Sequence, residues 1–163
     1  MISSVCVISL ILQSIFSNFT KVTDSYFNPL FAICALIIIY PYFKDKNKFL
    51  GVSFIYGVCY DILFSNFLFI HAFLFVLLGT IIMILNHLWT HNVINTVLFV
   101  ILTISIYKVI YYFLLAIIDK VGWTSMTCLN MITHSLISNI IYIILLYFIT
   151  SFISEKFKIH KIE

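Results

Sequence analysis

The chain has 163 residues, of which 63% are apolar or aromatic and only 9% charged, and its mean hydropathy is +1.16. A soluble domain carries about 25% charged residues because water must wet its surface, so this composition excludes an ordinary soluble domain. The net charge of +3 comes from lysines that lie in clusters, whereas a nucleic-acid-binding protein spreads basic residues over one exposed face. We therefore expect an integral membrane protein that binds no nucleic acid.

Polar interruptions divide the chain into six apolar segments, which we expect to be helices because unpaired backbone amides are too costly in lipid. The predicted spans of this single membrane domain, residues 1–163, are 2–19, 29–43, 49–64, 67–86, 93–118 and 129–153. The first segment lacks the basic region that precedes the apolar run of a signal peptide, so we expect a retained span. The second and third are shorter than the roughly 20 residues that cross a bilayer. Their flanks, such as Tyr40, Tyr42 and Lys44, can reach the interface, so we expect both to cross.

The distribution of lysines predicts the orientation of these six spans. One side of the membrane would hold six of them, namely Lys44, Lys46, Lys48, Lys156, Lys158 and Lys161. The opposite side would hold only Lys21 and Lys120. Cytoplasmic loops carry an excess of lysine and arginine, so we expect the N and C termini in the cytoplasm.

Ionisable side chains at membrane depth are rare and usually point into the helix bundle. Asp61 and Lys108 lie roughly 18 and 22 Å along helices that leave the cytoplasmic side, so we expect them to face each other or to share a polar pocket. His71, His134 and Asn139 descend from the outer side to a comparable depth. Three readings stay open: a small polar chamber for a ligand or ion, a packing lock that fixes the helices without binding anything, or a simple contact of Asp61 or His71 with the outer interface, since the third span is short.

Small and rigid residues mark predicted helix contacts. Gly57 and Asp61 are four residues apart and therefore share one helical face, where the glycine lets a neighbouring helix come close. Pro29 suits the first turn of a helix. His87 and His91 have a metal-like interval but no third ligand near them, so we expect interfacial anchoring.

No catalytic constellation, metal site or cofactor site is predicted. The sequence contains no zinc-protease, nucleophile-elbow or phosphate-loop motif. Its four cysteines form no C-x-x-C pair and sit in or beside apolar runs, where a free cysteine behaves as a small hydrophobe. We expect a protein that is not an enzyme.

Several of these residues together resemble the MreD family of rod shape-determining membrane proteins. Asn28–Phe31 opens a short span, and a second proline follows at Pro41. The stretch Gly51–Ser65 then reads G-x5-G-x3-D-I-L-x-S, and Asn139 is similar to the asparagine of the family's last span. Length and span count agree with the family over the whole chain.

The sequence departs from the family's pattern just after that stretch. Asn66 and Phe69 stand where the family has glycines, so we expect the turn between the third and fourth spans to differ in shape from the family's. Lys108 has no counterpart that we can match.

The resemblance implies a non-enzymatic component of the bacterial wall-elongation machinery in the cytoplasmic (inner) membrane. It would act as a scaffold that supports peptidoglycan synthesis and cell shape, binds the single-span protein MreC, and works near MreB, RodA and its transpeptidase partner. An exposed apolar groove would bind a partner's transmembrane helix.

The implied fold is a compact six-helix bundle similar to the substrate-binding subunits of vitamin ECF transporters. That likeness keeps an alternative open, in which the protein is such a subunit. Asp61, Lys108, His71 and His134 would then line a pocket for a small molecule.

Overall fold

A computed structural model describes residues 2–22, 29–65, 69–86, 92–118 and 125–157. The elements in chain order are α1 (Ile2–Val22), α2 (Phe31–Ile39), the 3-10 turn η1 (Tyr40–Tyr42), α3 (Lys46–Phe64), α4 (Ile70–Asn86), α5 (Val93–Ile118) and α6 (Ser125–Phe157). All regular structure in these ranges is helical, which confirms the predicted all-α fold.

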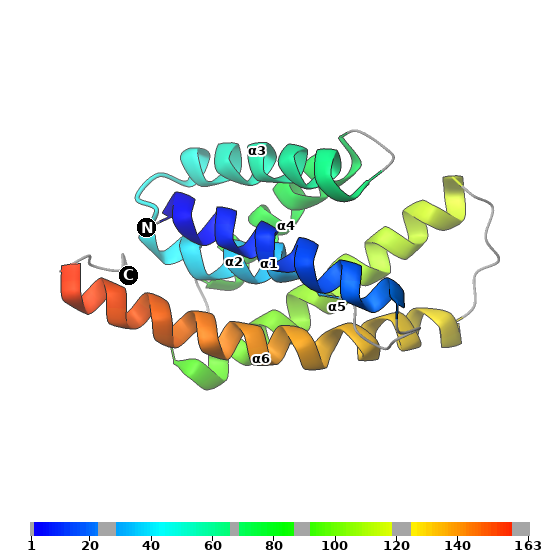
Figure 1. The fold of residues 1–163 in the computed structure, drawn as a ribbon. Coiled ribbons are helices and arrows are strands. Elements are labelled where there is room, and N and C mark those ends of the chain that lie inside the picture. The colour runs from blue at the N-terminus through cyan, green and yellow to red at the C-terminus, as the bar shows by residue number, and fades with distance from the viewer. Residues whose placement is uncertain (1, 23–28, 66–68, 87–91, 119–124, 158–163) are drawn as a thin grey trace.

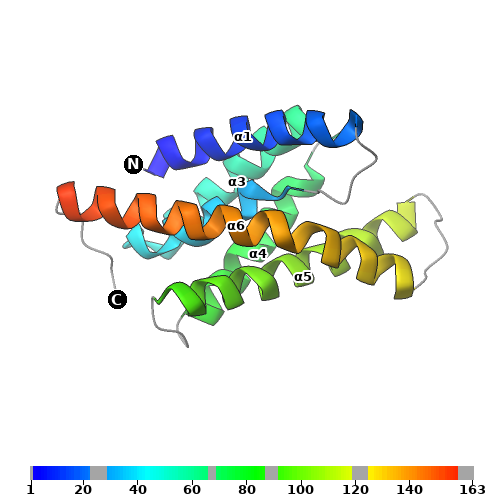
Figure 2. The ribbon, with the colours of Figure 1, turned by 60° about the horizontal axis from the view of Figure 1, so that its bottom comes forward.

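The short helix α2 lies at the centre of the bundle (Figures 1 and 2). Each of its nine residues, Phe31 to Ile39, is buried. The segment is apolar on every side, so it can be covered all round without burying an unpaired polar side chain. Helices α1 and α6 pack directly on it, and α4 and α5 complete its surroundings. The other helices pack mainly as two antiparallel pairs, α3 with α4 and α5 with α6.

The outer surface of the bundle is apolar, as expected for helices that face lipid. Large side chains such as Ile62, Phe73 and Ile94 are 67%, 69% and 74% exposed, where a soluble protein would place polar groups. Two stretches of the described chain are long and apolar enough to cross a membrane, Val93–Leu114 and Cys128–Phe157. Shorter apolar helices cover Ile2–Asn18, Phe31–Tyr42 and Ile70–Leu85. Crossing by all six helices stays a prediction.

Candidate functional site

Asp61 on α3 holds the beginning of α4. Its side chain is fully buried, and its two carboxylate oxygens accept the backbone N–H groups of His71 at 3.2 Å and of Ala72 at 3.1 Å. The Nδ1 atom of the His71 ring lies 2.7 Å from the same carboxylate. The first amides of a helix have no partner within that helix, and a negative charge is favourable at this end. Asp61 therefore caps α4 from the neighbouring helix.

Gly57, one turn before Asp61, allows the two helices to touch through their backbones. A Cβ atom at this position would lie 2.5 Å from the Cα atom of Ala72 and 2.7 Å from the carbonyl oxygen of His71. Only glycine fits so close an approach. Gly57, Asp61, His71 and Ala72 thus form one contact, here termed the α3–α4 joint, on the helical face that the spacing of Gly57 and Asp61 predicts.

The chain enters this joint through an unusual backbone conformation. Phe69, just before α4, has a φ angle of 73°, in the left-handed region that favours glycine. The departure noted in the sequence therefore leaves a phenylalanine in a conformation that glycine adopts without strain. Its carbonyl still accepts the N–H group of Phe73 at 3.1 Å, as the first bond of α4.

Aromatic rings enclose the His71 imidazole. The ring centroid of Tyr60 on α3 lies 4.7 Å from that of His71, and the centroids of Tyr111 and Tyr107 on α5 lie at 5.2 and 6.4 Å. Tyr107 and Tyr111 are themselves stacked, at 5.7 Å and an interplanar angle of 5°. The joint is therefore closed by α5, and His71 is part of a packed core.

The predicted pairing of Asp61 with Lys108 is not formed. Lys108 is buried on α5, yet among the described residues it makes neither an ion pair nor a hydrogen bond. The physical reason is that the Asp61 carboxylate is already hydrogen-bonded to the first backbone amides of α4 and to the His71 ring. His134 lies half-buried on α6, and no hydrogen bond or ion pair within the described chain joins it to Asp61 or His71. Of the four ionisable residues, the structure brings only two together.

A second polar contact holds the beginning of α2 in the centre of the bundle. Pro29 is buried, and the N–H group of the next residue, Leu30, donates to the Asn139 side chain of α6 at 2.8 Å. The N–H group of Ala32 donates to the Gln13 side chain of α1 at 3.0 Å. Two amide side chains, from helices far apart in sequence, therefore cap the buried end of α2.

Gln13 is the residue that the sequence analysis missed. Its Nε2 atom donates to the Tyr60 hydroxyl at 2.9 Å, so Gln13 links α1 and α2 to the ring that covers His71. The sequence could have indicated this role of Gln13, because an amide side chain in the middle of an apolar span must find a hydrogen-bond partner. Ser9 of the same helix makes a similar link, 2.7 Å from the Tyr142 hydroxyl of α6.

These contacts favour the packing lock over a polar chamber. Every fully buried side-chain nitrogen or oxygen in the described part of the chain has a hydrogen-bond partner. No group of three metal-ligating side chains occurs there either. His87, His91, Lys21 and Lys120 lie outside the residues whose side chains the structure describes.

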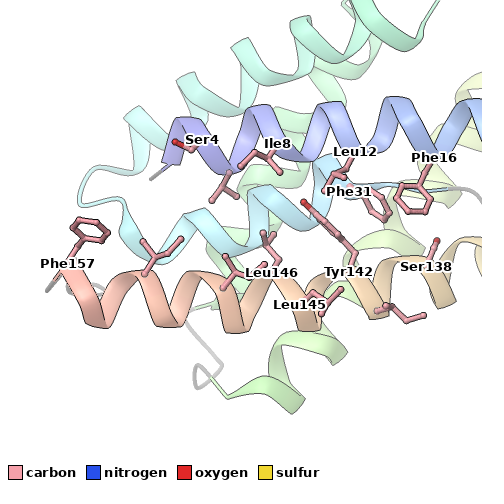
Figure 3. Close-up of a pocket in the computed structure, with 14 residues that line it drawn as sticks. Ser4, Ile8, Leu12, Phe16, Phe31, Ser138, Tyr142, Leu145, Leu146 and Phe157 are labelled. Atoms are coloured by element: carbon pink, nitrogen blue, oxygen red, sulfur yellow. The ribbon is translucent and has the colours of Figure 1, made fainter.

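An apolar groove of about 880 Å³ opens between α1 and α6, with Phe31 of α2 on its floor (Figure 3). From α1 it is lined by Ser4, Val5, Ile8, Leu12 and Phe16, and from α6 by Ser138, Ile141, Tyr142, Leu145, Leu146, Ile149, Ile153 and Phe157. None of these side chains is charged. The groove is thus an apolar recess on the described surface of the bundle.

The family model described as rod shape-determining protein MreD matches residues 1–156. No curated protein matches the chain. No solved structure matches it either.

Proposed function

The chain belongs to the MreD family, and from that membership we propose that it is a scaffold of the bacterial wall-elongation machinery. The family consists of shape-determining membrane components. In this proposal the protein crosses the cytoplasmic membrane six times, with both termini in the cytoplasm. It binds the single-span protein MreC and thereby supports peptidoglycan synthesis by RodA and its transpeptidase partner, near MreB. The family match over residues 1–156 carries the proposal.

The geometry supports a scaffold rather than a catalyst or carrier. Three polar residues of the apolar helices hold helix ends in place: Asp61 caps α4, and Gln13 and Asn139 cap α2. A bundle fixed in this way keeps its outer faces in constant relation to one another, which a scaffold requires. Its exposed apolar side chains offer a broad surface to the membrane-embedded segments of partners.

The alternative, a substrate-binding subunit of a vitamin transporter, has less support. Such a subunit needs convergent polar groups that are free to bind a small molecule. Asp61 and His71 instead bond to each other and to the backbone of α4. Lys108 and His134 make no hydrogen bond or ion pair with Asp61 or His71 within the described chain.

Depletion and co-purification test the proposal directly. In a rod-shaped host that depends on this protein, depletion is expected to round the cells, and affinity purification of a tagged chain in mild detergent is expected to recover MreC. An unchanged cell shape together with an absence of MreC from the eluate would overturn the scaffold role. A vitamin recovered by native mass spectrometry would favour the transporter reading instead.

A further inference from the structure

We propose that the α1–α6 groove binds an anionic phospholipid, with its acyl chains along the groove and its phosphate at the lysine-bearing end of the bundle. The proposal rests on the membrane location that is part of the proposed function. It also rests on the groove itself and on the lysines at one end of it. It does not depend on MreC or on any other protein partner.

One end of the groove lies at the end of the bundle that carries the exposed lysines. Figure 3 shows Ser4 and Phe157 at one end of the groove and Phe16 and Ser138 at the other. The first turn of α1, the last turn of α6 and the beginning of α3 lie at the same end of the molecule in Figure 1. One end of the groove therefore lies where the segment around η1 meets the end of α6.

One hydrogen bond fixes that meeting point. The Ser154 hydroxyl of α6 lies 2.8 Å from the Tyr42 hydroxyl of η1. Two residues beyond these partners stand Lys156 and Lys44, both exposed. Lys46 and Lys48 are exposed at the same end, and the acidic residues Asp45 and Glu155 offset part of this positive charge. The described residues at this end therefore carry a surplus of positive charge.

An apolar groove with basic residues at one end matches the chemistry of an anionic lipid. Basic pockets between transmembrane helices on the cytoplasmic side bind phosphate-containing headgroups. The uncharged lining residues of the groove suit hydrocarbon. The half of the groove from Phe157 to Leu145 runs about 18 Å along α6, close to the thickness of one leaflet, about 15 Å.

A partner's transmembrane helix fits the same groove less well. Interfaces between transmembrane helices are rich in small residues that let backbones approach, whereas this lining contains neither glycine nor alanine and only two serines, Ser4 and Ser138. The cytoplasmic flank of a partner span is usually basic, so it would meet Lys44 and Lys156 with repulsion. Flexible acyl chains adapt to walls of isoleucine, leucine and phenylalanine.

Native mass spectrometry of the full-length protein in mild detergent tests the proposal. The probes are phosphatidylglycerol and phosphatidylcholine with identical acyl chains, and retention of phosphatidylglycerol is expected to be higher by about tenfold or more. The double variant Lys44→Gln, Lys156→Gln is expected to abolish most of that preference. Leu145→Trp, which fills the groove, is expected to lower the retention of both lipids. Ile62→Trp, on an equally exposed face of α3, is the matched control and is expected to retain lipid as the unmodified chain does.

Three results would overturn the proposal. The first is equal retention of the two lipids by the unmodified chain, and the second is equal retention by Leu145→Trp and Ile62→Trp when both variants keep the thermal stability of the parent. The third is a photo-crosslinker at position 145 that captures a protein span rather than lipid in the cell membrane. Because the lipid assay uses the chain alone, a failure to bind MreC leaves its outcome unaffected, and a failure to bind lipid leaves the scaffold role standing.

Discussion

Replacing Gly57 by alanine is expected to force α3 and α4 apart. The added Cβ atom would lie 2.5 Å from the Cα atom of Ala72, 2.7 Å from the carbonyl oxygen of His71 and 2.9 Å from the backbone nitrogen of Ala72. All three are backbone atoms, so no side-chain rotation relieves the clash. The helices must separate by about 1 Å to restore ordinary contact. Such a movement lengthens the hydrogen bonds of Asp61, one turn further along α3.

The size of the effect follows from these contacts. Adding a methyl-sized group to a packed core typically costs 1–3 kcal/mol, and a clash with backbone places Gly57→Ala at about 3 kcal/mol. For a chain of this length, each 1 kcal/mol lowers the midpoint of thermal unfolding by about 2–4 °C. The midpoint is therefore expected to fall by roughly 6–12 °C.

Thermal unfolding in one detergent, followed by the loss of the monodisperse peak, measures this change. Gly51→Ala is the matched control, because it lies on the same helix and its Cβ atom would meet nothing within 4 Å. Alanine is the better helix former, so the control is expected to be neutral or slightly stabilising. Gly79→Ala, whose Cβ atom would meet only side-chain atoms at 3.1–3.4 Å, is expected to fall between the two. If Gly57→Ala and Gly51→Ala melt together, the close approach of α3 and α4 is wrong.

The same assay tests five further variants. Asp61→Asn weakens charge-assisted hydrogen bonds to α4 and is expected to lower the free energy of unfolding by about 1.5–3 kcal/mol. Asp45→Asn, at an exposed helix cap, is expected to lower it by at most about 1 kcal/mol. Equal losses of stability in the two variants would refute the buried cap. Asn139→Ala leaves a buried amide of α2 without its acceptor and is expected to cost about 1–3 kcal/mol, so an unchanged midpoint would contradict that contact. Lys108→Met removes a buried charge that has no partner in the described chain, and is expected to leave stability unchanged or raised; a clear loss would reveal an ion pair. Phe69→Gly relieves the left-handed backbone and is expected to stabilise by about 1 kcal/mol, and a loss would show that the ring packs more strongly than the backbone is strained.

Some of this arrangement follows from local sequence rules. The all-helical fold follows from long apolar runs, since lipid leaves unpaired amides no other partner. The contact of Gly57 and Asp61 with one neighbouring helix follows from their spacing of four residues. The central position of α2 also has a local cause, because a segment without a polar face is stable only when covered.

The partners of the polar side chains could not be read in the same way. Counting residues along a helix gives the depth of Asp61 and Lys108 but not the direction in which each points around the helix axis. Helix α5 is apolar on most of its faces, so its periodicity does not say which side meets α3. Gln13 and Asn139 meet at α2 only because α1 and α6 both pack against it, and this is a tertiary fact that no single segment encodes.

The capping of α2 by α6 has a consequence for biosynthesis. Asn139 is synthesised more than one hundred residues after Leu30, from whose N–H group its side chain accepts a hydrogen bond. During translation α2 therefore forms with an incomplete end, which only α6 completes. A ribosome-bound chain that stops before α6 is therefore expected to present that end to proteases and chaperones.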